Sequence, residues 1–567
     1  MTSPSTSVMP ALASGEKKAK RRLPLLPVKQ LLETQRSLTA VERFAKLHES
    51  PDAPLHEKFY RDLIPFEKPQ PGQQYAFEVD LDACTGCKAC VVACHNLNGL
   101  DKDELWRTVG LVHGGTNKAP VQQTITTSCH HCVEPACMLG CPTKAYEKDP
   151  VTGIVKHLDD QCFGCQYCTL MCPYDAPKYN AERGIVRKCD MCSDRLAHGE
   201  APACVQSCPN GAISIRVVDQ ESIVASSDVG MFVPGAPDPE HTLPTTQYKT
   251  QRALPSNLRP ADFYHTRSEH SHPPLVIMLT LTQLAVGAFV VAYAAQQLAG
   301  APIGSGLLQS LYACVVTLAA LGASVFHLGR PLLAYRAVLG LRTSWLSREA
   351  LVFGLFAKLA IGYGLLTALP ILPDFPGKDI ALSLTPYAPL VRTGAVWSGL
   401  LGVFCSVMVY VATRREQWSF TQTGLKFFST TLLLGCASVL AVSTFGAEAR
   451  AAHRPSLLHW VIMGCAAFKL VFEGHALSYA SDRRTTAMKR MALVMRGELS
   501  RVTMLRFGLL LVGGVLLPWE LLSQSSPGTS WAPIAIAMLG TLLAGELAER
   551  YLFFRAAPAS RMPGGLR

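Results

Sequence analysis

The stretch Cys162-Phe-Gly-Cys165-Gln-Tyr-Cys168-Thr-Leu-Met-Cys172-Pro173 decides how the first half of this chain folds. Three of its cysteines are each separated by two residues, and a fourth follows after three more residues and directly precedes a proline. A loop of this kind presents three sulfurs to three corners of one cubane cluster. In proteins with two clusters, the fourth cysteine of such a run ligates the other cluster. The stretch therefore predicts iron–sulfur ligation.

Three more cysteine runs of this type surround the first one. Sixteen of the 20 cysteines lie in four groups between positions 84 and 208. The groups are Cys84, Cys87, Cys90 and Cys94; Cys129, Cys132, Cys137 and Cys141; Cys162, Cys165, Cys168 and Cys172; and Cys189, Cys192, Cys204 and Cys208. Four groups of four thiolates predict four [4Fe–4S] clusters.

Zinc and disulfides are the alternatives for these cysteines. Paired C-x2-C motifs also bind zinc, but zinc sites rarely use three cysteines at two-residue intervals followed by a fourth and a proline. Disulfides fit a secreted domain. A secretory signal peptide needs an apolar region, and the apolar stretch after Arg21-Arg22 is too short for one and is broken by prolines. A twin-arginine export signal is an alternative interpretation of Arg21-Arg22. Metal–thiolate chemistry in a reducing compartment is the favoured one.

The second half of the chain has the composition of a membrane protein. From Leu275 to Phe554 it consists mainly of apolar runs, and eight of them reach the ~20 residues that a bilayer span needs. The net charge of +11 lies largely in loops between these runs, so it does not indicate a nucleic-acid partner. The predicted spans are 275–298, 306–327, 350–372, 391–413, 424–446, 456–480, 503–523 and 531–554.

Basic residues alternate between the loops and predict the orientation. The loops after the second, fourth and sixth spans, the segment before the first span and the C-terminal tail are rich in arginine. The intervening loops carry little more than Lys378, Arg450 and Arg454. Both ends of the anchor, and with them the cysteine-rich domain, are therefore expected to face the cytoplasm.

Residues from about 76 to 217 resemble the four-cluster electron-transfer subunits of the dimethyl sulfoxide reductase family. In that family the first and fourth groups share two clusters, and the middle groups share the other two. The resemblance implies four ligand sets: Cys84, Cys87, Cys90 and Cys208; Cys94, Cys189, Cys192 and Cys204; Cys129, Cys132, Cys137 and Cys172; and Cys141, Cys162, Cys165 and Cys168.

The second half resembles the anchor subunit of the same family. The resemblance rests on Ser324-Val-Phe-His327-Leu-Gly-Arg330-Pro331, on Leu346-Ser-Arg-Glu349-Ala and on Leu543-Ala-Gly-Glu546-Leu. It implies that His327 and Glu349 act at a menaquinol site, where an imidazole and a carboxylate can accept the two protons of quinol oxidation. The alternatives are a helix cap for Glu349 and an interfacial hydrogen bond for His327.

Other ionisable residues of the anchor have simpler interpretations. Lys469 and Glu473 are one helical turn apart and are expected to neutralise each other. A haem site is not expected, because the anchors of the family that the sequence resembles lack haem. The alternative function for this half is ion transport through Lys469, Glu473, Glu520 and Glu546.

The predicted fold class is an α+β doubled ferredoxin-like cluster domain followed by an all-α eight-helix transmembrane bundle. A strand is expected at Tyr75–Asp80, another at 153–157, and a helix at 28–47. The predicted divisions are an N-terminal extension (1–75), the cluster domain (76–217), a linker (218–272), the membrane anchor (273–556) and a cytoplasmic tail (557–567).

The two resemblances together imply an electron-transfer and anchor subunit of a molybdoenzyme complex in the inner membrane. Its expected partners are membrane lipid, the quinone pool and a separate molybdopterin-containing catalytic subunit, with no molybdopterin on this chain. Electrons would pass between menaquinol or quinone and that subunit. The alternatives are the same role in a quinone-reducing sulfite dehydrogenase, and a module serving a hydrogenase or formate dehydrogenase.

Overall fold

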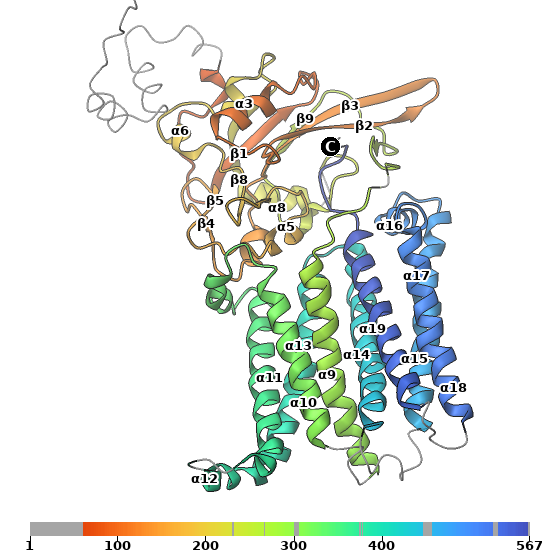
Figure 1. The fold of residues 1–567 in the computed structure, drawn as a ribbon. Coiled ribbons are helices and arrows are strands. Elements are labelled where there is room, and N and C mark those ends of the chain that lie inside the picture. Colours follow the sequence, from red (N-terminus) through yellow and green to blue (C-terminus); the bar gives the residue numbers. More distant parts are fainter. Residues whose placement is uncertain are drawn as a thin grey trace, which may run out of the picture. The chain divides into compact units, whose positions relative to one another are not determined.

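The structure is a computed structural model that describes residues 60–564, except 229–231, 266, 300–305, 374–375, 377, 446–455 and 525–530. Most of the predicted N-terminal extension, including the helix expected at 28–47, lies outside the described residues. Within the described part, an α+β region is followed by long helices, as Figure 1 shows. This order confirms the predicted fold class.

The α+β region is built on a three-stranded sheet in the order β8-β1-β9. Strand β1 (Gln73–Asp80) contains the strand expected at Tyr75–Asp80 and pairs antiparallel with β8 (Ile213–Asp219) and parallel with β9 (Gln247–Lys249). Phe77 and Val79 of β1 are buried in the main core of this region. The sheet therefore ties the start of the cluster region to the segment that follows the last cysteine group.

A second sheet and two hairpins complete the strands. The second sheet has the order β10-β2-β3, formed by Arg259–Pro260, Thr108–Thr116 and Ala119–Thr127. The hairpins are β4 (Tyr146–Lys148) with β5 (Val155–His157), and β6 (Lys178–Asn180) with β7 (Ile185–Arg187). The first hairpin contains the strand expected before the third cysteine group.

Short helices overlap or follow the cysteine groups. They are α3 (Ala89–Leu97), α4 (Ala136–Leu139), α5 (Tyr167–Met171), α6 (Ser193–Ala197) and α7 (Ala203–Gln206). Each cysteine group thus combines a loop with the first turns of a helix. This arrangement leaves backbone N–H groups near the sulfurs; for example, Ala145 donates its N–H to the sulfur of Cys141 over 3.2 Å.

The segment predicted as a linker, 218–272, has more structure than its composition suggests. It contains the end of β8, helix α8 (Gln220–Asp228), β9 and β10, and both of the later strands join sheets of the cluster region. The short strands lack the alternation of polar and apolar residues that marks longer ones, so only their pairing partners reveal them.

Eight helical segments are long and apolar enough to cross a membrane, which confirms the predicted count among the described residues. Their ends differ from the predicted spans by a few residues, and the third and fourth begin five to six residues earlier. The segments are α9 (Pro273–Ala299), α10 (Gly306–Val325), α11 (Trp345–Ala368), α13 (Ala388–Val411), α14 (Phe420–Ser443), α15 (Ser456–Ser478), α17 to α18 (Ser500–Ser523) and α19 (Trp531–Arg555).

The anchor has two apolar cores that meet at α9. One core lies mainly among α9, α10, α11 and α13, and the other among α9, α14, α15 and α17 to α19. Gly287 of α9 and Gly435 of α14 face each other so closely that a Cβ on Gly287 would lie 2.0 Å from the carbonyl oxygen of Thr431. Small residues allow such close helix packing in membranes, and here they join the two halves of the bundle.

The loops between the helices dock on the cluster region at several points. Arg330 donates its backbone N–H to Phe163 over 3.0 Å, and Ser344 donates its hydroxyl to Gly140 over 2.7 Å. Arg415 donates to the carbonyl oxygen of Leu170 over 3.1 Å. The basic loops after the second and fourth spans therefore contact the second and third cysteine groups.

The last described residues, predicted as a simple tail, also pack against the cluster region. Met562 is buried in its core, Arg561 forms an ion pair with Asp262, and the carbonyl oxygen of Gly564 accepts a hydrogen bond from Leu111 N–H over 2.9 Å. Gly564 has a φ of +76°, and a Cβ there would lie 1.8 Å from the oxygen of Leu111. Both constraints require glycine.

We expect Gly564→Val to release this C-terminal segment, because the added side chain is both strained and sterically excluded. Tryptic cleavage after Arg561 in the native protein should then become about tenfold faster, since proteolysis follows the population of the open form. Limited proteolysis followed by mass spectrometry measures this rate. The control, Ala559→Val, changes a partly exposed position of the same segment and should leave the rate within about twofold of the unmodified protein.

Candidate functional site

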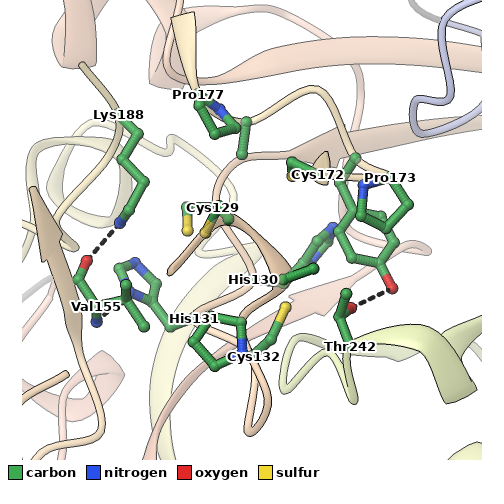
Figure 2. Close-up of a pocket in the computed structure, with 15 residues that line it drawn as sticks. Cys129, His130, His131, Cys132, Val155, Cys172, Pro173, Pro177, Lys188 and Thr242 are labelled. Atoms are coloured by element: carbon green, nitrogen blue, oxygen red, sulfur yellow. Dashed lines mark hydrogen bonds between the residues drawn. The ribbon is translucent and has the colours of Figure 1, made fainter. Parts of the chain in front are cut away.

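Four cysteines from two groups surround one internal cavity of the cluster region (Figure 2). Cys129, Cys132 and Cys137 come from the second group, and Cys172 comes from the third group. The structure thus brings together the same four cysteines that the resemblance assigns to one cluster.

Two further cavities have the same construction. One is lined by Cys94, Cys189, Cys192 and Cys204. The other is lined by Cys84, Cys87, Cys90 and Cys208. In both, three cysteines of one group are joined by one cysteine of another group, which is the pattern expected when two clusters exchange their fourth ligands.

The remaining four cysteines are also neighbours. Cys141, Cys162 and Cys168 pack in one small core, and Cys141 and Cys162 add to the effect of burial in raising the pKa of Cys165. Cys141 again comes from a different group than the other three. All sixteen predicted cysteines therefore fall into four sets of four.

The spacing of these side chains fits a cluster better than a single metal ion. In a zinc site each sulfur lies about 2.3 Å from the ion, so the four sulfurs crowd together. Among the described residues, no three His, Cys, Asp or Glu side chains are close enough to hold one ion. Sulfurs that surround a cavity without converging on a point suit a larger inorganic core.

Two buried cations lie against the cysteine sets, and the cysteine pattern did not predict them. Arg107 is 2 % exposed, lines the cavity of Cys94, Cys189, Cys192 and Cys204, and donates to Ser128 over 2.9 Å. Lys188 is 3 % exposed, lines the cavity of Figure 2, and donates to the carbonyl oxygens of Val155 and Cys189. Buried charges need compensation, and four thiolates around each cavity would supply it.

The two histidines of the second group are buried beside the same cavity. His131 accepts a hydrogen bond at Nδ1 from Val155 N–H over 3.1 Å, and burial lowers the pKa of His130 to about 3. Both imidazoles are therefore neutral near pH 7. They lie beside the cysteines as neutral hydrogen-bonding groups.

His327 lies where the anchor meets the third cysteine group. Its Nε2 is 3.1 Å from the carbonyl oxygen of Cys165. A carbonyl oxygen can only accept, so Nε2 carries the hydrogen and Nδ1 is the nitrogen able to accept a proton. Burial lowers the pKa of His327 to about 4, which keeps the ring neutral at pH 7. The loop following the second span thus presents a neutral imidazole beside a cysteine set.

Glu349 is buried near the start of α11 and does not act as a simple helix cap. Its carboxylate accepts a hydrogen bond from Ser406 of α13. Burial is the main cause of the raised pKa of Tyr167, and the negative charge of Glu349 raises this pKa further. Tyr167 lies between Cys165 and Cys168 and donates its hydroxyl to the carbonyl oxygen of Val409 over 2.8 Å. His327 therefore contacts the third cysteine group directly, whereas Glu349 acts on it through the electrostatic effect on Tyr167, and no described contact joins the two residues.

Two more histidines extend this region, and both come from the segment predicted as a linker. The ring centroid of His272 lies 5.4 Å from that of His327 and 4.7 Å from that of His270. Burial is the main cause that lowers the pKa of His272 to about 3, and the nearby His327 and His270 lower it further. The only sequence signal was a pair of histidines directly before the first span.

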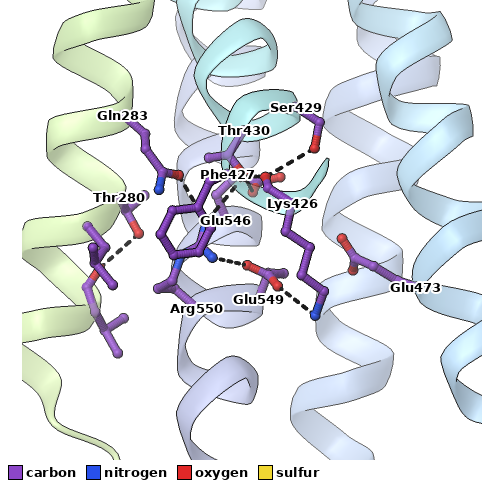
Figure 3. A network of polar contacts seen from close by, with 12 residues as sticks. Thr280, Gln283, Lys426, Phe427, Ser429, Thr430, Glu473, Glu546, Glu549 and Arg550 are labelled. Atoms are coloured by element: carbon purple, nitrogen blue, oxygen red, sulfur yellow. Dashed lines mark hydrogen bonds and ion pairs between the residues drawn. The ribbon is translucent and has the colours of Figure 1, made fainter. Parts of the chain in front are cut away.

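A separate network of charged side chains lies inside α14, α15, α17 and α19 (Figure 3). The predicted pairing of Lys469 with Glu473 is its weakest link, at 3.8 Å. Lys469 lies closer to Glu546, at 3.1 Å, and Glu473 forms a two-point ion pair with Arg506, at 2.8 and 3.0 Å. The further members are Lys426, Glu549 and Arg550. Adjacent helices therefore neutralise most of these charges.

The four residues of the alternative ion-transport route do not form one series of contacts in the described part of the chain. Glu520 is exposed on α18 and contacts Gln524, whereas Lys469, Glu473 and Glu546 are buried in the network. No described contact links Glu520 to the other three. The charged residues therefore form a local network near one end of the helices.

The second half of the sequence matches a known protein family. The family described as "DMSO reductase anchor subunit (DmsC)" matches residues 268–555, just over half of the sequence. This protein belongs to the DMSO reductase anchor subunit family. The match includes His327, Glu349 and all eight membrane helices.

The first half matches iron–sulfur proteins. The family described as "4Fe-4S dicluster domain" matches residues 121–218, which include the second, third and fourth cysteine groups. The probable anaerobic dimethyl sulfoxide reductase chain YnfG of Escherichia coli (strain K12) is 38% identical over 155 residues, covering 26% of this chain and 75% of the relative. A second anaerobic dimethyl sulfoxide reductase subunit of that strain gives the same values.

A third relative has another name. Formate dehydrogenase-O iron-sulfur subunit of Escherichia coli (strain K12) is 32% identical over 174 residues, covering 28% of this chain and 58% of the relative. Taken together, the matches confirm an iron–sulfur electron-transfer unit of the dimethyl sulfoxide reductase type fused to a DmsC-type anchor. The fused chain is a multi-pass membrane protein.

Proposed function

We propose that this chain passes electrons between menaquinol or quinone in the membrane and a separate molybdopterin-containing catalytic subunit. The observation that carries the proposal is the position of His327, whose Nε2 contacts the backbone of Cys165 in one of the four cysteine sets. A quinone-reactive group and a cluster ligand are thereby in direct contact. The direction of electron flow depends on the catalytic subunit.

Four [4Fe–4S] clusters are proposed, one in each cysteine set described above. Three cavities, the close packing of the fourth set and the buried cations Arg107 and Lys188 support this number. When bound, such clusters exchange single electrons at potentials set by charge, hydrogen bonds and exposure. Arg107 and Lys188 stabilise added negative charge, so they favour the reduced state of their sets.

At the proposed quinone site, His327 and Glu349 handle the protons. The Nδ1 atom of His327 can accept one proton from a quinol hydroxyl while its Nε2–H stays bonded to the carbonyl of Cys165. Glu349, bonded to Ser406, can accept the other. Running the same transfers in reverse would serve quinone reduction.

His327→Ala should lower the rate of quinol oxidation by about 10²–10³-fold, because a positioned acid–base group contributes typically 10²–10⁴. Glu349→Gln should have a comparable effect. Activity with a soluble dye that reduces the clusters directly should remain within about twofold of the unmodified complex. An equal loss in both assays would contradict a role at the quinone.

The partner is inferred from the relatives named as parts of dimethyl sulfoxide reductase. Their names describe them as components of a reductase, and the pterin-bearing subunit is proposed to be a different polypeptide. The proposed location is the inner membrane, with the cluster region on the cytoplasmic side as the arginine-rich loops predict. Under this orientation, a quinone-reducing sulfite dehydrogenase is an alternative role.

The complex purified from native membranes should contain about sixteen irons per chain, four for each [4Fe–4S] cluster. It should also contain one molybdenum-bearing large subunit per copy of this chain. Metal analysis and mass spectrometry of the copurified proteins measure both. Eight irons per chain would rule out four clusters.

The formate dehydrogenase relative supports a second candidate, in which the chain serves a dehydrogenase. The purification from native membranes described above also distinguishes this candidate from the reductase-type proposal. A haem-bearing or nickel-bearing complex would favour a formate dehydrogenase or a hydrogenase, whereas a molybdoenzyme without haem would favour the proposal. The family match of the anchor to DmsC is the reason for ranking the reductase type first.

A further inference from the structure

A cavity lies inside the first four spans, away from the cysteine sets. It has a volume of ≈ 290 Å³ and is lined by α9, α10, α11 and α13. Its polar lining includes Gln296, Gln309, Thr367 and Arg392. We call it the far-end cavity.

The lining residues of the far-end cavity lie at the end of the helices opposite to the cluster region. Its residues belong to the last turns of α9 and α11 and to the first turns of α10 and α13. Tyr363 lies 14 residues after Glu349 on α11, which corresponds to roughly 20 Å along the helix axis. The cavity is therefore distinct from the proposed quinone site.

Arg392 provides a fixed positive charge in this cavity. Its guanidinium lies over the ring of Tyr293 at 5.3 Å and over the ring of Tyr363 at 5.9 Å, and it donates to the side-chain oxygen of Gln296. Among the described residues, no carboxylate forms an ion pair with it. The two aromatic rings and one amide thus hold the guanidinium in place without neutralising it.

A second hydrogen-bond donor is unused. Gln309 is 9 % exposed, and its Nε2 has no hydrogen-bond partner within the described part of the chain. A buried donor left unpaired costs about 1–3 kcal/mol, so a ligand that accepts hydrogen bonds would relieve this cost. Next to these polar groups, the cavity wall is apolar and includes Ala288, Phe289 and Ala313.

We propose that the far-end cavity binds the phosphodiester group of a membrane phospholipid. A planar guanidinium matches the oxygens of a phosphate at two points and remains charged at every accessible pH. The amide of Gln309 supplies a further donor, and the apolar wall can accept the start of an acyl chain. A neutral quinone would satisfy the donors but would leave the charge of Arg392 unpaired.

The test is lipid binding by the purified full-length protein. After delipidation in mild detergent, phosphatidylglycerol is titrated in and the complexes are counted by native mass spectrometry. One lipid should bind with markedly higher affinity than the rest. Arg392→Gln and Gln309→Leu should each weaken that site about tenfold or more, because each removes a donor to a charged group. Arg392→Lys should retain part of the affinity.

Arg348→Gln is the matched control, since Arg348 also lies over an aromatic ring, Trp345 at 4.3 Å, but at the cluster end of the bundle. The lipid affinity of the Arg348→Gln variant should equal that of the unmodified protein. The visible absorbance of the clusters and the elution volume verify folding, and Gln309→Leu carries the test if Arg392→Gln does not fold.

Inorganic phosphate separates the two sources of this ligand chemistry. If millimolar phosphate competes with the lipid, the site is assigned to free phosphate. If millimolar phosphate does not compete, the site is assigned to the lipid. The proposal is overturned if both variants bind the lipid as tightly as the control, or if the retained occupant is a quinone. Neither result bears on the cysteine sets or on His327.

Discussion

Cys172→Ala is expected to remove one complete cluster, lowering the iron content from about sixteen to about twelve atoms per chain. The reason is that Cys172 lies in the third cysteine group but lines the cavity of Cys129, Cys132 and Cys137. The loss should therefore appear at the second group, and the cluster proposed for the rest of the third group should remain. Electron transfer from quinol to the catalytic subunit should fall by at least about 100-fold, since the proposed route runs through all four sets.

Iron analysis and electron paramagnetic resonance of the reduced protein measure the outcome. Cys465→Ala is the control, because Cys465 is a membrane-helix cysteine outside the four sets and should leave the iron content unchanged. Loss of the cluster at Cys162, Cys165 and Cys168 instead would show that each group keeps its own fourth cysteine.

Arg506→Met is expected to destabilise the anchor by roughly 3–5 kcal/mol, the usual cost of removing one partner from a buried ion pair. Arg506 is fully buried and contacts Glu473 at 2.8 Å and Glu546 at 3.0 Å. Without it, Lys469 is the cation left near both carboxylates. The free energy of unfolding, measured by denaturant titration in mild detergent, should fall by this amount.

The control is Arg501→Met, at an exposed position near the start of the same helix, which should change the free energy of unfolding by no more than about 0.5 kcal/mol. Combining Arg506→Met with Glu473→Met removes both partners of the closest pair and should recover part of the loss. Equal effects of the two arginine substitutions would mean that water reaches the network in Figure 3 and replaces the ion pairs.

The variants of the C-terminal segment, of His327 and Glu349, and of the far-end cavity all probe contacts between segments that are distant in the sequence. The Gly564 contact ties the C-terminal segment to Leu111, and His327 reaches Cys165 across the junction of the two halves. Fusion of the two parts in one polypeptide makes these contacts intramolecular. We infer that the fused arrangement favours docking of the cluster region on its anchor by raising their effective concentration.

Local patterns in the sequence were sufficient for the fold class and the span count. Cysteine spacing is a property of one short loop, and apolar length is a property of one helix, so each can be recognised without knowing what lies next to it. The eight helices were found in this way, and the strand at Tyr75–Asp80 was found from its alternation of residue types, which is also a local pattern. The third and fourth spans begin five to six residues earlier than predicted, because a helix can extend beyond its apolar stretch.

The sequence by itself determined the cysteine groups and the membrane helices, and its resemblance to the anchor family supplied the candidates His327 and Glu349. Only the tertiary structure decided that Arg107 and Lys188 lie beside cysteine sets, that His272 adjoins His327, and that Lys469 pairs with Glu546 more closely than with Glu473. Each of these contacts joins residues far apart in the sequence. A buried charge takes whichever partner the packing of the helices and sheets brings within reach, and no local spacing encodes that choice.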